Sequence, residues 1–130
     1  MKCPCCSGLL YEQCCKPLHE GTPPETALAL MRSRYSAYAQ ALPAYIQKTT
    51  HPKSPHFEQT LDLWTEEILT FCRSTEFIRL EIVSYKENFV HFKAHLKQNN
   101  KTFILEEKSH FEKVGSDWLY LKGELIPQPE

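Results

Sequence analysis

Cysteines are concentrated at the start of this chain, at a higher density than a hydrophobic core requires. Five of the first fifteen residues are cysteines, at these positions: Cys3, Cys5, Cys6, Cys14 and Cys15. Thiolates at this density are typical of a bound metal ion, and zinc binds four such ligands in a tetrahedron. Cys3 and Cys5 form one ligand pair, and an eight-residue loop separates them from the second pair, Cys14 and Cys15. Four thiolates leave no position open for water, so the pattern predicts a structural zinc site.

Two other uses of the cysteines stay open. A disulfide framework is typical of short secreted proteins, but Met1 and Lys2 lead into the cysteines without an apolar leader segment. Thiol redox chemistry commonly uses a C-x-x-C pair, and Cys3 and Cys6 have that spacing, although inside a larger cluster. We favour the metal, and we expect the chain to remain in the reducing cytoplasm.

The cysteine segment resembles the SEC-C motif, a zinc knuckle found at the C-terminus of the translocase motor SecA and in many small bacterial proteins. The residues that match it are Cys3, Cys5, Ser7, Gly8, Tyr11, Cys14 and Cys15. The resemblance implies that the zinc ligands are Cys3, Cys5, Cys14 and Cys15. Cys6 stands where the motif usually has glycine, so it is either a bystander, which we favour, or a substitute for Cys5. His19 is a more remote substitute ligand.

Length and charge limit the size of the protein and its partners. The 130 residues suffice for one modest domain with the knuckle as an appendage, so we assign residues 1–20 to the knuckle and 21–130 to the domain. A net charge of −1 without a basic run does not favour nucleic acid as a partner, although zinc knuckles can contact RNA. The longest apolar run, around residues 27–31, is too short to span a membrane.

Hydrophobic periodicity predicts a first helix after the knuckle. Thr22, Pro23 and Glu25 form a capping box with proline in the first turn, so the helix should begin there. Its apolar face is a stripe at helical spacing, namely Leu28, Met31, Tyr35, Tyr38 and Leu42.

Two more helices are expected before the chain changes character. A short one should begin near Pro43 and end before His51-Pro52. A third should extend to about Arg73, because an apolar stripe at helical spacing comprises Phe57, Leu61, Trp64, Ile68, Phe71 and Cys72. Cys72 lies within that stripe, so we interpret it as a core thiol.

After Ser74 the apolar period shortens from that of a helix to that of a strand. We expect strands over 77–85, 89–96, 103–111 and 118–121, with turns at 98–101 and 115–117. Helices followed by an antiparallel meander predict an α+β domain in which the helices cover one face of a curved sheet.

As a whole, the chain resembles the YchJ family of small bacterial proteins, which join a SEC-C knuckle to a domain similar to nuclear transport factor 2. Beyond the knuckle, the match is carried by residues 29–38, 50–52, 107–111 and 118–123. The resemblance implies a cone of helices packed over a strongly bent sheet, often with a pocket at the open end. The chain departs from the family at Glu106, commonly histidine, and at Lys122, commonly aspartate. The resemblance to the family implies a fold and no particular reaction.

The third expected strand places a carboxylate in an apolar row. The residues sharing one face are Phe103, Leu105, Glu107, Ser109 and Phe111. Such a carboxylate needs a partner, and Arg34 lies beside the apolar stripe of the first helix. We favour a structural ion pair between Arg34 and Glu107. The alternative is a pocket for a small polar ligand, in which Tyr38 and Tyr120 donate their hydroxyls.

Three histidines are weaker candidates for chemistry. His51 could act as an acid or base, but we favour a place at a helix C-terminus, near free carbonyls. His91 and His95 share the strand face opposite Val90 and Phe92, so we expect them to face solvent. The sequence contains no Ser-His-Asp order and no phosphate-binding glycine loop.

Two functions fit these features. In the first, the protein is a zinc-binding adaptor whose knuckle contacts a protein partner through the surface around Leu9, Leu10 and Lys16. In the second, it binds a small molecule or is an isomerase- or hydrolase-like enzyme with its site in the cone. Redox sensing by Cys6 is a third and weaker hypothesis.

Overall fold

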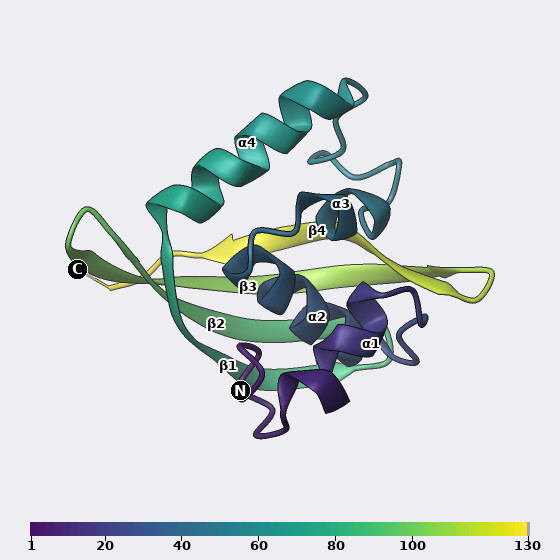
Figure 1. The fold of residues 1–130 in the computed structure, drawn as a ribbon, viewed down its shortest axis with the longest axis horizontal. Helices are drawn as coiled ribbons and strands as arrows, with labels where there is room; N and C mark the ends of the chain where they lie inside the picture. Colours follow the sequence, from purple (N-terminus) through teal and green to yellow (C-terminus); the bar gives the residue numbers. More distant parts are fainter. Residues whose placement is uncertain (130) are drawn as a thin grey trace.

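A four-stranded antiparallel sheet carries helices on one face in the computed structural model, which describes residues 1–129 (Figure 1). The elements in chain order are η1 (Tyr11–Gln13), α1 (Cys15–His19), α2 (Ala27–Ala39), α3 (Pro43–Lys48), α4 (Leu61–Ser74), β1 (Glu76–Lys86), β2 (Phe89–Gln98), β3 (Lys101–Val114) and β4 (Asp117–Ile126). The strands cross the sheet in the order β1-β2-β3-β4. The predicted α+β class, with helices before an antiparallel meander, is confirmed.

The helix α2 begins later than the capping box predicted. Its N-cap is Thr26, whose hydroxyl accepts a hydrogen bond from the Ala29 N–H at 3.0 Å. The prediction of a start at Thr22 is wrong, because the chain through Pro23 and Pro24 stays outside the helix. A residue that precedes a proline avoids helical backbone angles, so the proline pair delays the helix.

Other element boundaries differ by a few residues. The helix α3 begins at Pro43 as predicted, whereas α4 begins at Leu61, so Phe57 lies before it and packs on Trp64 with 5.2 Å between ring centroids. Strand β4 continues past residue 121, because its last residues still pair with β3 up to Ile126. No helix of the described chain is long and apolar enough to cross a membrane.

The hairpin between β2 and β3 forms at the predicted place. Asn99 and Asn100 both adopt positive φ, 51° and 63°. Two successive residues of this kind form the tight turn whose twist suits an antiparallel hairpin, and asparagine tolerates that conformation better than most residues.

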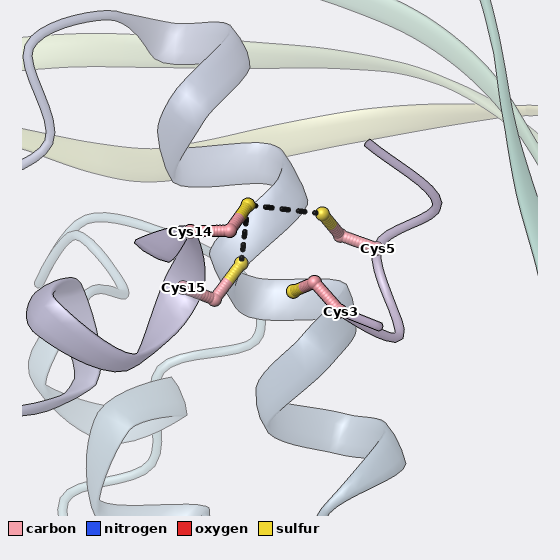
Figure 2. A group of neighbouring side chains, drawn as sticks. All are labelled: Cys3, Cys5, Cys14 and Cys15. Carbon is pink, nitrogen blue, oxygen red and sulfur yellow. Dashed lines mark hydrogen bonds between the residues drawn. The ribbon is translucent and has the colours of Figure 1, made fainter. Parts of the chain in front are cut away.

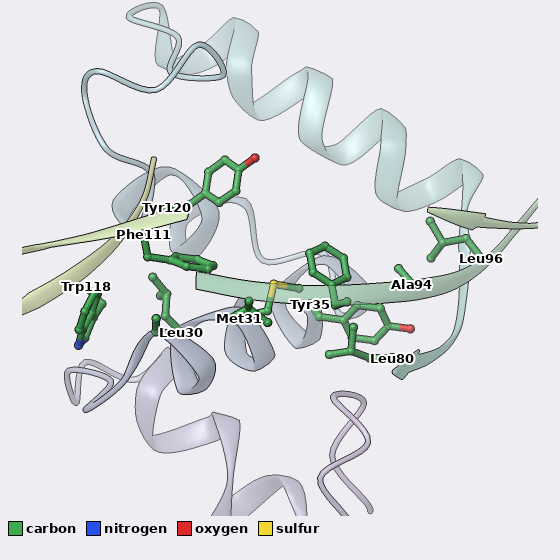
Figure 3. Packing of buried hydrophobic residues seen from close by; sticks show 12 residues of the cluster. Leu30, Met31, Tyr35, Leu80, Ala94, Leu96, Phe111, Trp118 and Tyr120 are labelled. Carbon is green, nitrogen blue, oxygen red and sulfur yellow. The ribbon is translucent and has the colours of Figure 1, made fainter. Parts of the chain in front are cut away.

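Two hydrophobic clusters share α2. The larger one fills the space between α2 and the helix-facing side of the sheet, called the inner face below (Figure 3). Its large buried members include Leu30, Met31, Tyr35, Val90, Phe92, Leu96, Phe111 and Trp118. The smaller cluster joins the end of α2 to α3 and α4 through Ala37, Tyr45, Ile46, Trp64 and Ile68, with Cys72 packed at its margin. Burying each large apolar side chain contributes about 1.5–3 kcal/mol, so α2 is the central support of the domain.

Segments outside the sheet contact both of its edge strands. On β4, Tyr120 receives a hydrogen bond from the His51 N–H at 2.8 Å and donates its own N–H to the Thr49 carbonyl at 2.8 Å. On β1, the Leu80 N–H donates to the Cys6 sulfur at 3.4 Å. These contacts occupy backbone groups that would otherwise invite pairing with another chain.

Candidate functional site

A small hairpin at the N-terminus shapes the first half of the cysteine cluster. The Cys3 N–H donates to the Leu9 carbonyl at 2.9 Å, and Lys2 and Leu10 form an isolated antiparallel bridge. The chain reverses between them, where Cys6 and Gly8 both adopt positive φ. Glycine takes this conformation without strain. The reversal directs the Cys3 and Cys5 side chains toward one point (Figure 2).

The second half of the cluster comes from the junction of η1 and α1. Cys14 follows η1 and Cys15 opens α1, so both sulfurs lie at the start of the short helix. Cys14 Sγ lies 3.6 Å from Cys5 Sγ and 3.9 Å from Cys15 Sγ (Figure 2). The ligand atoms of Cys3, Cys5, Cys14 and Cys15 all lie within 4.8 Å of one another.

The spacing of the four sulfurs fits a tetrahedral metal site. A tetrahedron with zinc–sulfur bonds of about 2.3 Å has sulfur–sulfur edges of about 3.8 Å. The Cys5–Cys14 and Cys14–Cys15 sulfur distances, 3.6 Å and 3.9 Å, bracket that length, and the other sulfur pairs lie within 4.8 Å. All six cysteines are free thiols, and Cys3, Cys5 and Cys15 are buried. The four thiols are therefore close enough together to hold one metal ion.

The electrostatics of the cluster are those of crowded thiols that compete for charge. A hydrogen bond from the Cys15 thiol lowers the pKa of Cys5 to about 4. The same interaction, followed by burial, raises the pKa of Cys15, and burial raises the pKa of Cys14. One thiolate is thus stabilised at the expense of its neighbours. Four thiolates can coexist here only beside a cation, which is what a metal supplies.

The two substitute ligands lie apart from the cluster. Cys6 is exposed, and its sulfur contacts the Pro4 carbonyl at 3.6 Å and the Leu80 N–H. His19 uses both ring nitrogens: Nε2 donates to the Ser33 carbonyl at 2.8 Å, and Nδ1 accepts from the Tyr11 hydroxyl at 2.8 Å. The structure thus places Cys5 in the cluster with the other thiols and leaves both Cys6 and His19 outside it.

Polar side chains of α2 hold the knuckle against the domain. Arg32 donates to the Cys5 carbonyl at 2.8 Å, and Ser36 Oγ lies 3.7 Å from Cys3 Sγ. Together with the bond from His19 to Ser33, these contacts tie three points of the knuckle to one helix. Sequence analysis did not identify these α2 contacts. Their signal was the presence of two serines, Ser33 and Ser36, that are fully buried within an otherwise apolar helix.

Three of the candidate pocket residues, Arg34, Glu107 and Tyr120, meet on the inner face. The fourth, Tyr38, lies four residues after Arg34 on α2 and packs on Phe71 and Phe77. Arg34 is buried, with its Cζ 4.7 Å from the centroid of the Tyr120 ring. The Tyr120 hydroxyl donates to Glu107 Oε1 at 2.8 Å. Among the ion pairs of residues 1–129, none joins Arg34 to Glu107. The predicted direct ion pair is therefore wrong, because each charged group contacts Tyr120 instead: Arg34 lies against its ring, and Glu107 accepts from its hydroxyl. We call Arg34, Tyr38, Glu107 and Tyr120 the cone cluster.

Gly123 makes room for the carboxylate of this cluster. It pairs with Ser109 on the neighbouring strand, and a Cβ at this position would overlap the carboxylate of Glu107. The Glu107 side chain can therefore lie across β4 and reach Tyr120. Glu107 is half-buried rather than exposed, so it stays a candidate for binding.

Four contacts involve the three histidines that the sequence offered as candidates. His51 accepts from the Lys53 N–H through Nδ1 at 2.9 Å, and its Nε2 lies 3.5 Å from Glu112. With both nitrogens engaged, His51 has no lone pair free for proton abstraction.

The expectation that the two strand histidines, His91 and His95, face solvent is wrong in part. They lie on the outer face, but their side chains are only 16% and 18% exposed and pair with glutamates: His91–Glu106 at 2.6 Å and His95–Glu81 at 3.2 Å.

Two surface hollows lie outside the cone cluster. One of about 330 Å³ lies where α4 meets β1 and the β2–β3 turn, with Arg73 and Lys97 in its wall. The other, of about 70 Å³, lies between the end of the knuckle, α3 and the β3–β4 turn, against Trp118. Neither touches Arg34 or Glu107, so neither supplies a closed cavity for chemistry at the cone cluster.

Known proteins resemble the chain over nearly its whole length. The family model described as the YchJ middle NTF2-like domain matches residues 26–123. A UPF0225 protein of Vibrio cholerae is 37% identical over 133 residues, which cover 95% of this chain and 83% of that protein. A UPF0225 protein of Streptomyces coelicolor is 34% identical over 129 residues, which cover 95% of both chains.

Two solved structures have the same fold and include the knuckle. The solution structure of a SEC-C motif containing protein from Rhodopseudomonas palustris matches with a TM-score of 0.81 and 30% identity, over 98% of this chain and 100% of that one. The crystal structure of a SEC-C motif containing protein from Psychrobacter arcticus matches with a TM-score of 0.74 and 30% identity, over 98% of this chain and 84% of that one.

Proposed function

The chain belongs to the YchJ family, and from that premise we propose that it is a small zinc-binding protein whose knuckle binds a protein partner. The observation that carries this proposal is that one segment holds both a cluster of four thiols and exposed apolar side chains. A cytoplasmic location accords with six free thiols, because reducing conditions preserve them.

Zinc is the metal that best suits the donor set. Four sulfurs at tetrahedral spacing favour zinc over cations that prefer oxygen ligands. With all four positions filled by protein, the ion would have a structural role and no water to activate. The similar structures described as SEC-C motif containing proteins support the same assignment.

The binding surface we propose consists of Met1, Leu9 and Leu10, here called the knuckle patch. These side chains are 71%, 51% and 45% exposed. The hairpin brings their backbone segments together, because it bridges Lys2 to Leu10 and the Tyr11 N–H donates to the Met1 carbonyl at 2.9 Å. Adjacent exposed apolar side chains are typical of interaction sites.

Rigidity links the proposed metal to the knuckle patch. Leu9 and Leu10 are held by backbone bonds to the strand that carries Cys3, so a metal at Cys3 would fix their positions. A surface fixed before binding loses less conformational entropy when a partner arrives. The exposed Lys2 and Lys16 would favour a partner with acidic residues around an apolar centre.

The test compares two pairs of exposed leucines. Leu9→Ala with Leu10→Ala removes the knuckle patch, and Leu61→Ala with Leu63→Ala on α4 removes a similarly exposed apolar pair. Tagged proteins are expressed in the cytoplasm, cross-linked, and their partners quantified by mass spectrometry. We expect a defined partner to be lost only from the knuckle variant, with zinc content unchanged. Retention of all partners by that variant, or equal loss from both, contradicts the proposal.

A second candidate function places a small-molecule site or an enzyme in the cone. The observation that favours it is the set of unpaired polar groups in the cone cluster. We rank enzymatic activity lower, because such chemistry generally needs a pocket that excludes water, and both hollows described above lie elsewhere. Native mass spectrometry of freshly purified protein would count bound metal and detect any retained ligand together.

A further inference from the structure

Arg34 is a buried charge without a carboxylate to balance it. Its side chain is 7% exposed, and no ion pair of residues 1–129 includes it. Its hydrogen bonds all leave from Nη1, to the Ile46 carbonyl and to the hydroxyls of Thr49 and Thr50. Within the described chain, Nε and Nη2 therefore have no acceptor. A guanidinium in this state is stabilised by any anion that can reach it.

Glu107 is the matching acceptor, and a hydrogen bond from Tyr120 holds its carboxylate in place. Its Oε1 accepts from the Tyr120 hydroxyl, and its Oε2 has no donor within residues 1–129. Gly123 lets the carboxylate lie across β4. Beyond Glu107 the inner face is open to solvent, since Leu125 is 69% and Phe103 38% exposed. A small molecule can therefore approach the carboxylate from that side.

Two hydroxyls on the elements that carry these charges also lack partners within residues 1–129. Ser109 Oγ is fully buried and has no hydrogen bond to any described residue, and it lies two residues along the same strand face from Glu107. Tyr38 makes no side-chain hydrogen bond within the described chain. Burial raises the pKa of Tyr38, Arg34 opposes that rise and Glu107 adds to it. Tyr38 follows Arg34 by four residues on α2, so the two side chains lie on the same face of that helix.

We propose that the cone cluster binds a small zwitterion, an amino carboxylate whose carboxylate lies against Arg34 and Tyr38 and whose ammonium group lies against Glu107. The cluster offers unused donors at one end and an unused acceptor at the other, and both ends contact Tyr120. A ligand carrying both charges satisfies both ends and leaves the site neutral. An anion or a cation alone would leave one end unpaired.

The probes for this site are five small molecules. Glycine, β-alanine and 4-aminobutyrate carry both charges at increasing separation, while acetate and methylammonium carry one each. Each is titrated into the full chain, and NMR follows the Arg34 Nε–H signal with the backbone amides of Glu107 and Tyr120. We expect at least one zwitterion to shift these signals with a Kd about tenfold or more below those of acetate and methylammonium.

Matched variants identify the residues responsible. Glu107→Gln and Tyr38→Phe should each weaken zwitterion binding, by about tenfold for the charged contact. The controls are Glu106→Gln, the neighbouring carboxylate on the outer face, and Tyr35→Phe, which removes an unpartnered hydroxyl elsewhere on α2. Both controls should bind like the wild type.

Three results would overturn the zwitterion site. The first is that no zwitterion moves the Arg34 signal, and the second is that acetate binds as tightly as the best zwitterion. The third is that Glu106→Gln weakens binding as much as Glu107→Gln. The amide spectrum of each variant reports whether it is folded. Should Glu107→Gln fail to fold, Tyr38→Phe and the comparison among the five probes still decide.

Discussion

The knuckle and the cone cluster handle charge in opposite ways. In the knuckle, four thiols from one short segment converge, and their charge can be balanced only by a cation from outside the chain. In the cone cluster, the chain supplies both signs of charge, but Arg34 of α2 and Glu107 of β3 each contact Tyr120 of β4 instead of pairing directly. A local cluster can be inferred from spacing, whereas a cluster built from distant elements depends on how those elements pack.

The sharpest way to break this comparison is to remove one thiol. In Cys5→Ser, we expect loss of bound zinc, disorder of residues 1–20 and a stability loss of more than about 4 kcal/mol, because structural zinc supplies folding free energy. Elemental analysis counts the metal, and denaturant unfolding measures stability. The control Cys6→Ser, whose sulfur lies outside the cluster, should keep its zinc. A zinc-free Cys5→Ser protein with an ordered knuckle would contradict the structural role.

A smaller effect tests the cone cluster. Gly123→Ala places a methyl group where the Glu107 carboxylate lies, so we expect a stability loss of about 1–3 kcal/mol from displacing it. In a Glu107→Ala background the obstacle is gone, and the same change should cost less than about 0.5 kcal/mol. A double-mutant cycle by urea unfolding measures the difference. Equal costs in both backgrounds would mean that Gly123 serves another purpose.

Removing a contact between the knuckle and α2 should cost less stability again. Arg32→Ala removes the bond to the Cys5 carbonyl, and we expect a loss of about 1–2 kcal/mol with faster hydrogen exchange in the knuckle hairpin. Arg73→Ala, an exposed arginine of α4, is the matched control and should change stability by less than about 0.5 kcal/mol. If knuckle exchange does not respond to Arg32→Ala, the knuckle is held by its other contacts.

The smallest expected change in stability comes from Glu106 on the outer face of the sheet, away from both regions. Hydrogen bonds from Gln128 and then His91 lower the pKa of Glu106 from its usual 4.5. A carboxylate whose folded pKa is lowered stabilises the protein above its unfolded pKa, and this stability is lost as pH falls through the folded value. Glu106→Gln should therefore flatten the stability profile only below about pH 4.5. Thermal unfolding from pH 3 to 7 measures it, and a change confined to neutral pH would contradict this assignment.

Sequence patterns predicted most of the framework. The change of apolar period after Ser74 separated helices from strands, and the cysteine spacing grouped the four thiols that the structure brings together. Errors arose where two local signals competed, as at Thr22, where a good capping box lost to the extended backbone that Pro23 and Pro24 require. The strand β4 extended further than its polar residues suggested, because pairing with β3 continues to Ile126 regardless of side-chain type.

The amino-acid sequence by itself determined where the knuckle lies, because its candidate ligands all come from one turn-rich segment whose spacing brings thiols together. Only the tertiary structure decided that Cys5 rather than Cys6 joins the cluster, that Arg34 and Glu107 each contact Tyr120 instead of pairing directly, and that the carboxylate lies over Gly123. Those facts depend on strand register and on the packing of α2 against the sheet. Both are set by contacts between residues far apart in the chain, which no local pattern records.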